Sequence, residues 1–259
     1  MNAEGTHLDK IREQFTRQAE AYIRMRQTTD ERGLRALVML AGVWPEHRVL
    51  DVACGPGFLT MALATRCTGA VGIDATTAFL AHARAEALRR GLTNIEFCAG
   101  DAEGMPFEDT TFDRVTCRAA FHHLPRPARV LAEMVRVMRP DGRLVIADML
   151  GSEDSGKAEY RDHMERLCDP THVRALPASA FATLFSEAGL CVELQPRTSL
   201  HTDADEWIAH GGPNATDAAR AIALMEASVD VDRCGLDVRR ENGTLRFSYP
   251  AVVYVVRRG

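Results

Sequence analysis

The sequence between residues 48 and 150 alternates short apolar runs with helix-forming runs. RVLDVA, AVGIDA, IEFCAGDA, FDRVTCRAAF and RLVIADML have the length and apolar character of strands. Helical patterns occur at GFLTMALATRC, TAFLAHARAEALRRG and PARVLAEMVRVMRPDG, the last of which we expect to end at Pro140-Asp141-Gly142. Short apolar strands separated by helices are typical of a parallel, doubly wound sheet with helices on both faces. We therefore predict an α/β fold.

Helical segments flank this core on both sides. Residues 7–40 have a helical pattern, with LDKIREQFTRQAEAYI carrying an apolar stripe. After Leu150 we expect helices at EYRDHMERLCD and ASAFATLFSEAG, one strand at LCVELQPRTSL, and a hairpin around Asn242-Gly243. The predicted parts are a helical arm (1–44), a ligand-binding core (45–150), and a C-terminal half (151–259) that completes the sheet and carries a helical lid at about 201–231.

Acidic residues end three consecutive strands of the predicted sheet. Asp51 precedes the turn Cys54-Gly55-Pro56-Gly57, Asp74 ends the second strand, and Asp101 ends the third. The carboxyl ends of parallel strands meet at one edge of a sheet, where open α/β sheets bind their ligands. We therefore expect the three carboxylates to converge on the glycine-rich turn.

Three carboxylates at one turn disfavour a polyphosphate, although a helix N-terminus after glycines ordinarily attracts anions. Ribose hydroxyls can donate to Asp74, which follows Gly57 by 17 residues (74 − 57), close to the roughly 20 expected for a ribose-binding acid. An adenine amino group can donate to Asp101, and an ammonium or sulfonium group can lie near Asp51. Gly55 and Gly57 permit close approach of the backbone. A ligand with these groups and no phosphate is S-adenosylmethionine, which we expect also to contact Ala75 and Ala102.

The residues quoted so far resemble a known family. VLDVACGPG, the acid of VGIDAT, and GDAEGMPFEDTTFDRV followed by HHLPRPARVLAEMVRVMRPDGRLVIAD are similar to class I S-adenosylmethionine-dependent methyltransferases, most of all the small-molecule group related to ubiquinone and menaquinone methyltransferases. The resemblance covers residues 10–150 well and 160–259 more loosely. It implies a Rossmann-like sheet of seven strands whose last strand, VVYVVRR, is antiparallel. It also implies in-line methyl transfer to an O, N or C atom of a small molecule.

Three further positions are candidate cofactor contacts. Ala53 stands where the family's glycine triplet often begins with Gly, and alanine fits such a turn without strain when its φ is negative, as we expect here. Arg118 ends the fourth strand and is expected to contact the methionine portion of the cofactor through its backbone. Tyr22 of the N-terminal arm either closes over the cofactor or packs with Phe15 in the core.

Histidines supply the candidate catalytic groups. His122 and His123 are adjacent and cannot face the same way in a regular element, so the pair is a poor metal site and no metal is predicted. Because the resembled family uses this segment to line the site below the methyl donor, we predict His123 as the general base, with His172 as the second candidate. A near-neutral pKa suits that role. His122, His163 and Arg174 are predicted to contact the substrate, with packing or surface positions as the alternative.

Composition limits the partners. A net charge of −5 without a long basic run disfavours nucleic acid. A polar N-terminus and the lack of an apolar run near about 18 residues disfavour a membrane span. Seven scattered cysteines without a CxxC motif indicate a reducing compartment, so we expect a cytoplasmic protein.

Two alternative functions remain open. A cyclase or lyase could bind S-adenosylmethionine without methylating a substrate, because it would require the same constellation of acids and glycines. A nicotinamide-dependent oxidoreductase is disfavoured by the acid beside the turn and by Thr60, which stands where a third glycine is usual.

Overall fold

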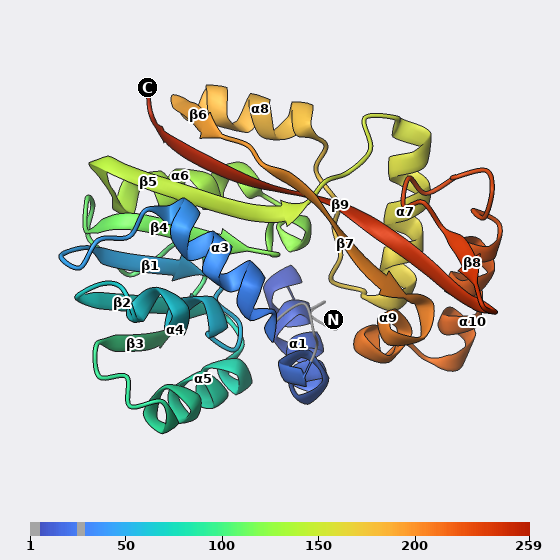
Figure 1. The fold of residues 1–259 in the computed structure, drawn as a ribbon, viewed down its shortest axis with the longest axis horizontal. Coiled ribbons are helices and arrows are strands. Elements are labelled where there is room, and N and C mark those ends of the chain that lie inside the picture. Colours follow the sequence, from blue (N-terminus) through green and yellow to red (C-terminus); the bar gives the residue numbers. More distant parts are fainter. Residues whose placement is uncertain (1–5, 25–28) are drawn as a thin grey trace, which may run out of the picture.

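A twisted, mostly parallel sheet forms the larger lobe of the molecule (Figure 1). The computed structural model describes residues 6–24 and 29–259, so residues 25–28 of the predicted N-terminal helices lie outside the described residues. The main path of the sheet runs β3-β2-β1-β4-β5-β9-β6. Its strands are β1 (Arg48–Val52), β2 (Gly69–Asp74), β3 (Ile95–Ala99), β4 (Phe112–Arg118), β5 (Met138–Met149), β6 (Leu190–Leu194) and β9 (Thr244–Arg258). The first five strands on this path are parallel, and β9 runs antiparallel to β5 and β6, as predicted for the last strand.

Helices cover both faces of this sheet, which explains why its strands read as continuous apolar runs. α3 (Glu31–Ala41), α4 (Phe58–Ala64) and α5 (Thr77–Arg89) pack on one face, and α6 (Pro127–Val137) and α8 (Ala178–Glu187) pack on the other. Successive side chains of β5 point to opposite faces of the sheet. Val145 packs in the core under α3, α4 and α5, and Ile146 packs in the core under α6 and α8. The doubly wound architecture is therefore confirmed.

A smaller lobe is built on the other half of β9 (Figure 1). The 15-residue β9 extends beyond the main sheet, where β7 (Arg197–Asp203) and β8 (Arg239–Glu241) pair with it. α7 (Ser155–Cys168), α9 (Ala204–Gly211) and α10 (Ala215–Glu226) pack there around a separate core that includes Trp207 and Phe247. The two added strands, β7 and β8, extend the predicted seven to a nine-stranded sheet.

Proline sets two boundaries that differ from the prediction. The helix expected to reach Gly142 ends at Val137, and the chain is already extended at Met138, two residues before Pro140. The single strand expected over 190–200 is two strands, β6 and β7, with Pro196 between them. β7 continues to Asp203, so the first residues of the segment expected to be helical over 201–231 are strand. The predicted hairpin at Asn242-Gly243 is confirmed, with φ of 50° and 84° at these residues.

Helix α1 (His7–Arg24) bridges the two lobes. It contacts α5 in the larger lobe and α9 in the smaller lobe (Figure 1). Gln14 and Gln18 each donate a hydrogen bond to the carbonyl of Gly211, at the end of α9. α1 therefore lies across the carboxyl ends of the parallel strands. Within 6–24 and 29–259, no helix has the length and apolar character needed to cross a membrane.

Candidate active site

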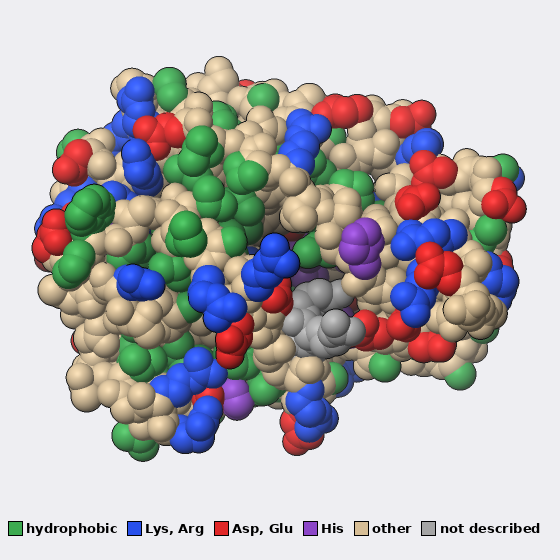
Figure 2. All heavy atoms as spheres, viewed as in Figure 1, with side chains coloured by type: hydrophobic (Ala, Val, Ile, Leu, Met, Phe, Trp, Pro, Cys, Tyr) green, Lys and Arg blue, Asp and Glu red, His purple; other side chains and the backbone are tan. Residues whose placement is uncertain are grey.

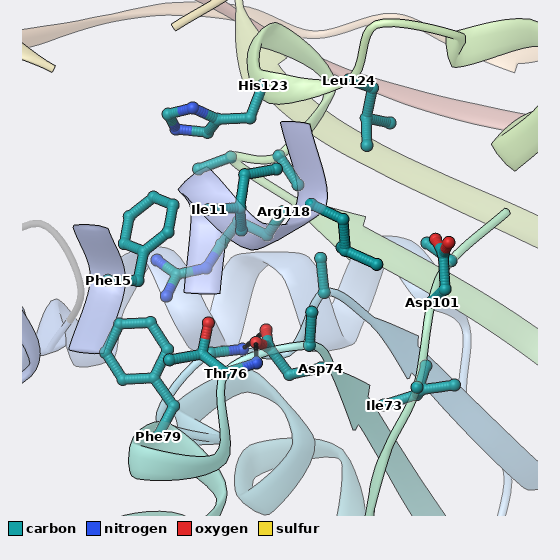
Figure 3. A pocket seen from close by; sticks show the side chains of 18 of the residues that line it. Ile11, Phe15, Ile73, Asp74, Thr76, Phe79, Asp101, Arg118, His123 and Leu124 are labelled. Atoms are coloured by element: carbon teal, nitrogen blue, oxygen red, sulfur yellow. Dashed lines mark hydrogen bonds between the residues drawn. The ribbon is translucent and has the colours of Figure 1, made fainter. Parts of the chain in front are cut away.

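A cavity opens at the carboxyl ends of the parallel strands, beneath α1 (Figure 3). Asp74 reaches it from the end of β2, Asp101 from the loop after β3, and Arg118 from the end of β4. Ile11 and Phe15 of α1 cover it. The sheet thus brings together groups that are far apart in the sequence, as the strand-end argument predicted for Asp74 and Asp101.

The turn after β1 is held in a left-handed conformation at alternate residues. Ala53, Gly55 and Gly57 have φ of 52°, 54° and 78°. The expectation of a negative φ at Ala53 is therefore wrong, and this alanine sits where L-residues are strained by about 1–2 kcal/mol. Gly57 is needed for space as well, since a Cβ there would lie 2.7 Å from the ring of Phe97. Ala53 and Gly55 both line the cavity.

Asp74 ties the turn after β1 to the turn after β2. One carboxylate oxygen accepts from the backbone N–H of Gly55 at 2.8 Å, and the other accepts from the N–H of Thr76 at 2.8 Å. Burial raises the pKa of Asp74. Each carboxylate oxygen keeps a second lone pair for a ligand. The hydroxyl of Thr76 is buried beside them without a hydrogen-bond partner.

Asp101 completes the polar lining of the cavity. Its carboxylate accepts from the N–H of Glu103 at 2.9 Å, and Ala75 and Ala102 line the cavity with it. Acceptor oxygens of two carboxylates and an unpartnered hydroxyl suit a nucleoside that carries hydroxyl and amino donors. The residues present therefore fit the cofactor predicted from the sequence.

Asp51 lies behind this cavity and does not line it. Its two carboxylate oxygens accept from the hydroxyls of Thr60 and Thr116, at 2.7 and 2.8 Å, and only 2% of the residue is exposed. Burial raises the pKa of Asp51 from 3.8 to about 6, against the lowering effect of the two hydroxyls. The expectation that Asp51 faces the cofactor's cationic groups is not met, because its hydrogen bonds fix β1 to α4 and β4 instead.

Tyr22 lines the cavity from α1 and also packs against aromatic neighbours, so both sequence readings apply to it. Its ring lies edge-on to Phe15, with centroids 5.9 Å apart, and 5.2 Å from the ring of Phe79. Arg118 projects into the cavity, and Figure 3 shows its guanidinium directed toward Phe15. Arg118 thus faces the cavity with its side chain, whereas its backbone contact was predicted.

His123 faces the cavity at its junction with the smaller lobe. Its Nδ1 lies 3.1 Å from the hydroxyl oxygen of Thr171, and that hydroxyl donates to Asp169 at 2.6 Å. The Thr171 oxygen must therefore accept from Nδ1–H, which leaves the lone pair on Nε2. Burial, and secondarily the neighbouring His122, lowers the pKa of His123 to about 3. The expected near-neutral pKa is not what this environment produces.

His122 and His172 are each paired with a buried carboxylate. His122 Nδ1 lies 2.6 Å from Asp148, and His172 Nε2 lies 2.7 Å from Asp162. Burial disfavours the imidazolium of His122, but the charge and hydrogen bond of Asp148 outweigh it and raise its pKa. The rings of His122 and His172 are 5.8 Å apart, and that of His123 is 4.1 Å from His122. His172 is 4% exposed and does not line the cavity, and its ring lies 6.5 Å from that of His123.

Two predicted substrate residues point away from this region. The side chains of His163 and Arg174 are exposed, and only the backbone N–H of Arg174 reaches the cluster, donating to the carbonyl of His122 at 3.2 Å. On α7 the buried side carries Asp162 and Glu165, and His163 lies off that side. Neither residue lines the cavity, and their contact with substrate stays a prediction. Across 6–24 and 29–259, no three His, Cys, Asp or Glu side chains are arranged to hold a metal ion.

The sequence reasoning missed Thr76, Asp148 and the Thr171–Asp169 pair. Asp148 stands near the end of β5, so the same search for acids at strand ends would have found it. Thr76 follows Asp74 by two residues and begins α5 as its N-cap. Thr171 lies in an irregular loop, where no local pattern predicts which side chain it meets.

Comparisons with known proteins agree with this geometry. Residues 45–195 match the model of the methyltransferase domain family. The uncharacterized methyltransferase YcgJ of Bacillus subtilis strain 168 is 32% identical over 219 residues, which are 85% of this chain and 87% of YcgJ. The demethylmenaquinone methyltransferase of Renibacterium salmoninarum is 37% identical over 114 residues, 44% of this chain and 46% of that protein.

Solved structures extend the likeness over most of the fold. The crystal structure of YcgJ superposes with a TM-score of 0.83 at 31% identity, covering 88% of this chain and 99% of that one. A putative methyltransferase from Bacillus halodurans C-125 gives 0.82 at 27% identity, covering 87% and 98%. The chain belongs to the methyltransferase domain family, and it is a class I S-adenosylmethionine-dependent methyltransferase related to the quinone methyltransferases.

Proposed function

We propose that the enzyme methylates a small-molecule acceptor that binds between the two lobes, next to His123. The observation that carries this proposal is the position of His123, whose ring borders the cofactor cavity while its Nδ1 is held by Thr171 of the smaller lobe. The demethylmenaquinone methyltransferase relatives support an acceptor of small size. In this arrangement α1 of the arm (1–44) and the helices within 201–231 form a lid over the core (45–150), with the C-terminal half (151–259) completing the acceptor side.

The cofactor roles follow from the lining of the cavity. Asp74 and the hydroxyl of Thr76 accept from and donate to the ribose, and Asp101 accepts from the adenine amino group. The strained turn at Ala53 and Gly55 brings the backbone close to the methionine end, beside Arg118. Tyr22 closes the cavity on the side of α1. Ala75 and Ala102 leave room for the nucleoside because their side chains are small.

Methyl transfer from S-adenosylmethionine requires only a weak general base. When bound, S-adenosylmethionine supplies a methyl carbon already activated by its sulfonium, so that alignment provides much of the acceleration. An acceptor hydroxyl or amine becomes far more acidic as its new bond to carbon forms. The Nε2 lone pair of His123 therefore suffices to take that proton despite the low pKa of this imidazole. The Nδ1–H···Thr171···Asp169 chain stabilises the imidazolium that results.

A labelling experiment tests the class of acceptor. The purified enzyme and S-adenosylmethionine with an isotope-labelled methyl group are incubated with small-molecule, protein and nucleic-acid fractions of one cell lysate. We expect label in the small-molecule fraction, with a mass gain of one CH₂ unit and an equal amount of S-adenosylhomocysteine. Label confined to protein or nucleic acid would contradict the proposal. A small-molecule product that forms without gain of mass would favour the non-methylating cyclase or lyase instead.

A further inference from the structure

The first turn of α1 lies against the segment that carries His123. His7, the first residue of α1, has its Nε2 2.8 Å from the carbonyl oxygen of His123. A carbonyl oxygen can only accept, so the imidazole of His7 must donate a hydrogen from Nε2. The two residues are 116 positions apart in the sequence. The contact therefore depends on the docking of α1 across the strand ends.

Reciprocal hydrogen bonds fix the first turn of α1, and with it the position of His7. The N–H of Asp9 donates to the hydroxyl of Thr6 at 3.3 Å. The carboxylate of Asp9 accepts from the N–H and the hydroxyl of Thr6, at 3.0 and 2.7 Å. This is the pattern of a capping box, with aspartate in the place of glutamate. It satisfies N–H groups that a helix end otherwise leaves without partners, so His7 is held in a formed turn.

The same helix also contacts the imidazole ring of His123. Phe15, about two turns after His7, packs edge-on against this ring, with centroids 5.2 Å apart and an interplanar angle of 86°. α1 thus contacts the backbone of His123 through His7 and its ring through Phe15. The ring nitrogen Nδ1 is held separately by Thr171 of the smaller lobe. The position of His123 therefore depends on both α1 and the smaller lobe.

α1 closes the cofactor cavity at the same time. Four of its side chains line the cavity, namely Leu8, Ile11, Phe15 and Tyr22. In the view of Figure 3, Ile11 and Phe15 lie between His123 and Asp74, the residue proposed to bind the ribose. One helix therefore covers the cofactor and fixes the residue proposed to act as the general base. Closure over the cofactor and placement of the base are coupled through α1.

The placement of His123 matters because a general base must lie within hydrogen-bond reach of the proton that it takes. The surface is hollowed between the two lobes (Figure 2), and His123 lies at their junction. Among the hydrogen bonds of residues 6–24 and 29–259, His7 is the only donor to the carbonyl of His123. We propose that His7 is a positioning residue, which aligns His123 with the acceptor when α1 is closed over the cofactor. This inference rests on the proposed function, because His7 acts through the base assigned there.

Nuclear magnetic resonance of the enzyme saturated with S-adenosylhomocysteine tests the position of His123 without an acceptor. Histidine labelled with carbon-13 gives a Cε1–H resonance for His123, which is identified by its absence from His123→Ala. We expect His7→Leu to shift this resonance. His7→Gln should leave it in place, because the glutamine amide supplies an N–H where the imidazole has Nε2–H. Lys10→Leu, an exposed change one turn along α1, is the control and should have no effect. A resonance that His7→Leu leaves unmoved would overturn the proposal.

Rates of methyl transfer separate positioning from a merely structural role. The rate is measured as label passing from saturating S-adenosylmethionine to the small-molecule fraction. We expect His7→Leu to lower it about tenfold or more, with affinity for S-adenosylhomocysteine within about twofold of the wild type. His7→Gln should restore most of the rate, and Lys10→Leu should match the wild type. An equal loss of rate and cofactor affinity in His7→Leu would mean that His7 only anchors α1. If the wild type labels no small molecule, the proposed function fails, whereas the resonance still decides whether His7 places His123.

Discussion

The cofactor cavity and the histidine cluster between the lobes are neighbours, but they are built by different rules. In the cavity, Asp74 and Asp101 follow the ends of consecutive strands, so the sheet alone brings them together. In the cluster, His172 meets Asp162 through an irregular loop and a helix of the second lobe, and both pack beside His122, which is held by Asp148 near the end of β5. A site placed by strand register tolerates change in its loops, whereas a site placed by buried ion pairs depends on each partner. Substitutions in the cluster are therefore expected to reduce mainly the stability of the fold, and those in the cavity mainly the affinity for the cofactor.

Asp148→Asn should produce the largest loss of stability. The change keeps the side-chain volume but leaves His122 buried without its charged partner, at a cost of about 3 kcal/mol. Because Asp148 raises the pKa of His122, the pair contributes stability below the ordinary histidine pKa and loses it as pH rises through the raised value. Urea denaturation should therefore show a larger difference from the wild type at pH 5 than at pH 9. The same loss at both values would mean that the pair is not charged.

Asp74→Ala should separate cofactor binding from folding. The variant loses two hydrogen bonds from backbone N–H groups to a carboxylate and the acceptors for the ribose. Charged hydrogen bonds contribute about 1.5–3 kcal/mol each, so we expect affinity for S-adenosylhomocysteine to fall by about 100-fold or more. Calorimetric titration measures this, with exposed Glu108→Ala as the matched control. A change of less than fivefold would remove Asp74 from the cofactor site.

His123→Ala should reduce turnover by about 100-fold and leave affinity for S-adenosylhomocysteine within twofold, because the imidazole acts on the acceptor. Exposed His163→Ala is the control and should have wild-type turnover. His123 stays neutral down to about pH 3, so it adds no limb to the pH profile of kcat between pH 5 and 8. A limb in that range that disappears in His123→Ala would show that the imidazole titrates in the working enzyme.

The sequence predicted the helices and strands that depend on local pattern. It missed the boundaries that depend on proline and the strand pairing that builds the second lobe. Alternating apolar strands and helices predicted the larger lobe, and Asn242-Gly243 predicted the β8–β9 hairpin. The helix end at Val137 and the division between β6 and β7 depend on Pro140 and Pro196, whose effects the helical and strand patterns concealed. The length of β9 and its pairing with β7 depend on contacts between residues 43 to 55 positions apart, which no local pattern reports.

The residues of the candidate site also fall into those that the sequence predicted and those that it did not. Asp74, Asp101 and His123 were predicted from strand ends and from the family resemblance, and they line the cavity. His163 lies off the buried side of α7, and the pattern of this segment predicted a helix but not which of its sides meets the other lobe. Asp162 could not be paired with His172 from the sequence, since that contact joins a helix to an irregular loop.

Asp51→Asn should stabilise the larger lobe at high pH. Burial raises the pKa of Asp51 from 3.8 to about 6, so the folded protein holds this proton more tightly than the unfolded chain does. The contribution to stability is therefore favourable below about pH 4 and is lost as pH rises through 6, a penalty of roughly 2–3 kcal/mol. The asparagine carries no charge to bury, so its melting temperature should exceed that of the wild type at pH 8 and converge with it at pH 4. A variant less stable at both values would show that the hydroxyls of Thr60 and Thr116 require a carboxylate.

Ala53→Gly should have the smallest effect, although it changes the one residue at which the cofactor turn departs from the family pattern. The φ of 52° strains alanine, and glycine relieves that strain but loses more chain entropy on folding, so the two terms offset to within about 0.5 kcal/mol. Ala53→Val is the informative partner, because a β-branched residue at this φ adds strain and should cost about 2 kcal/mol. Affinity for S-adenosylhomocysteine should rise a few-fold in the glycine variant, since Ala53 lines the cavity and glycine leaves more room there. Equal stability of the glycine and valine variants would mean that the turn relaxes to negative φ. In that case the strands of the sheet would fix the position of Asp74 but not the conformation of the turn at Ala53.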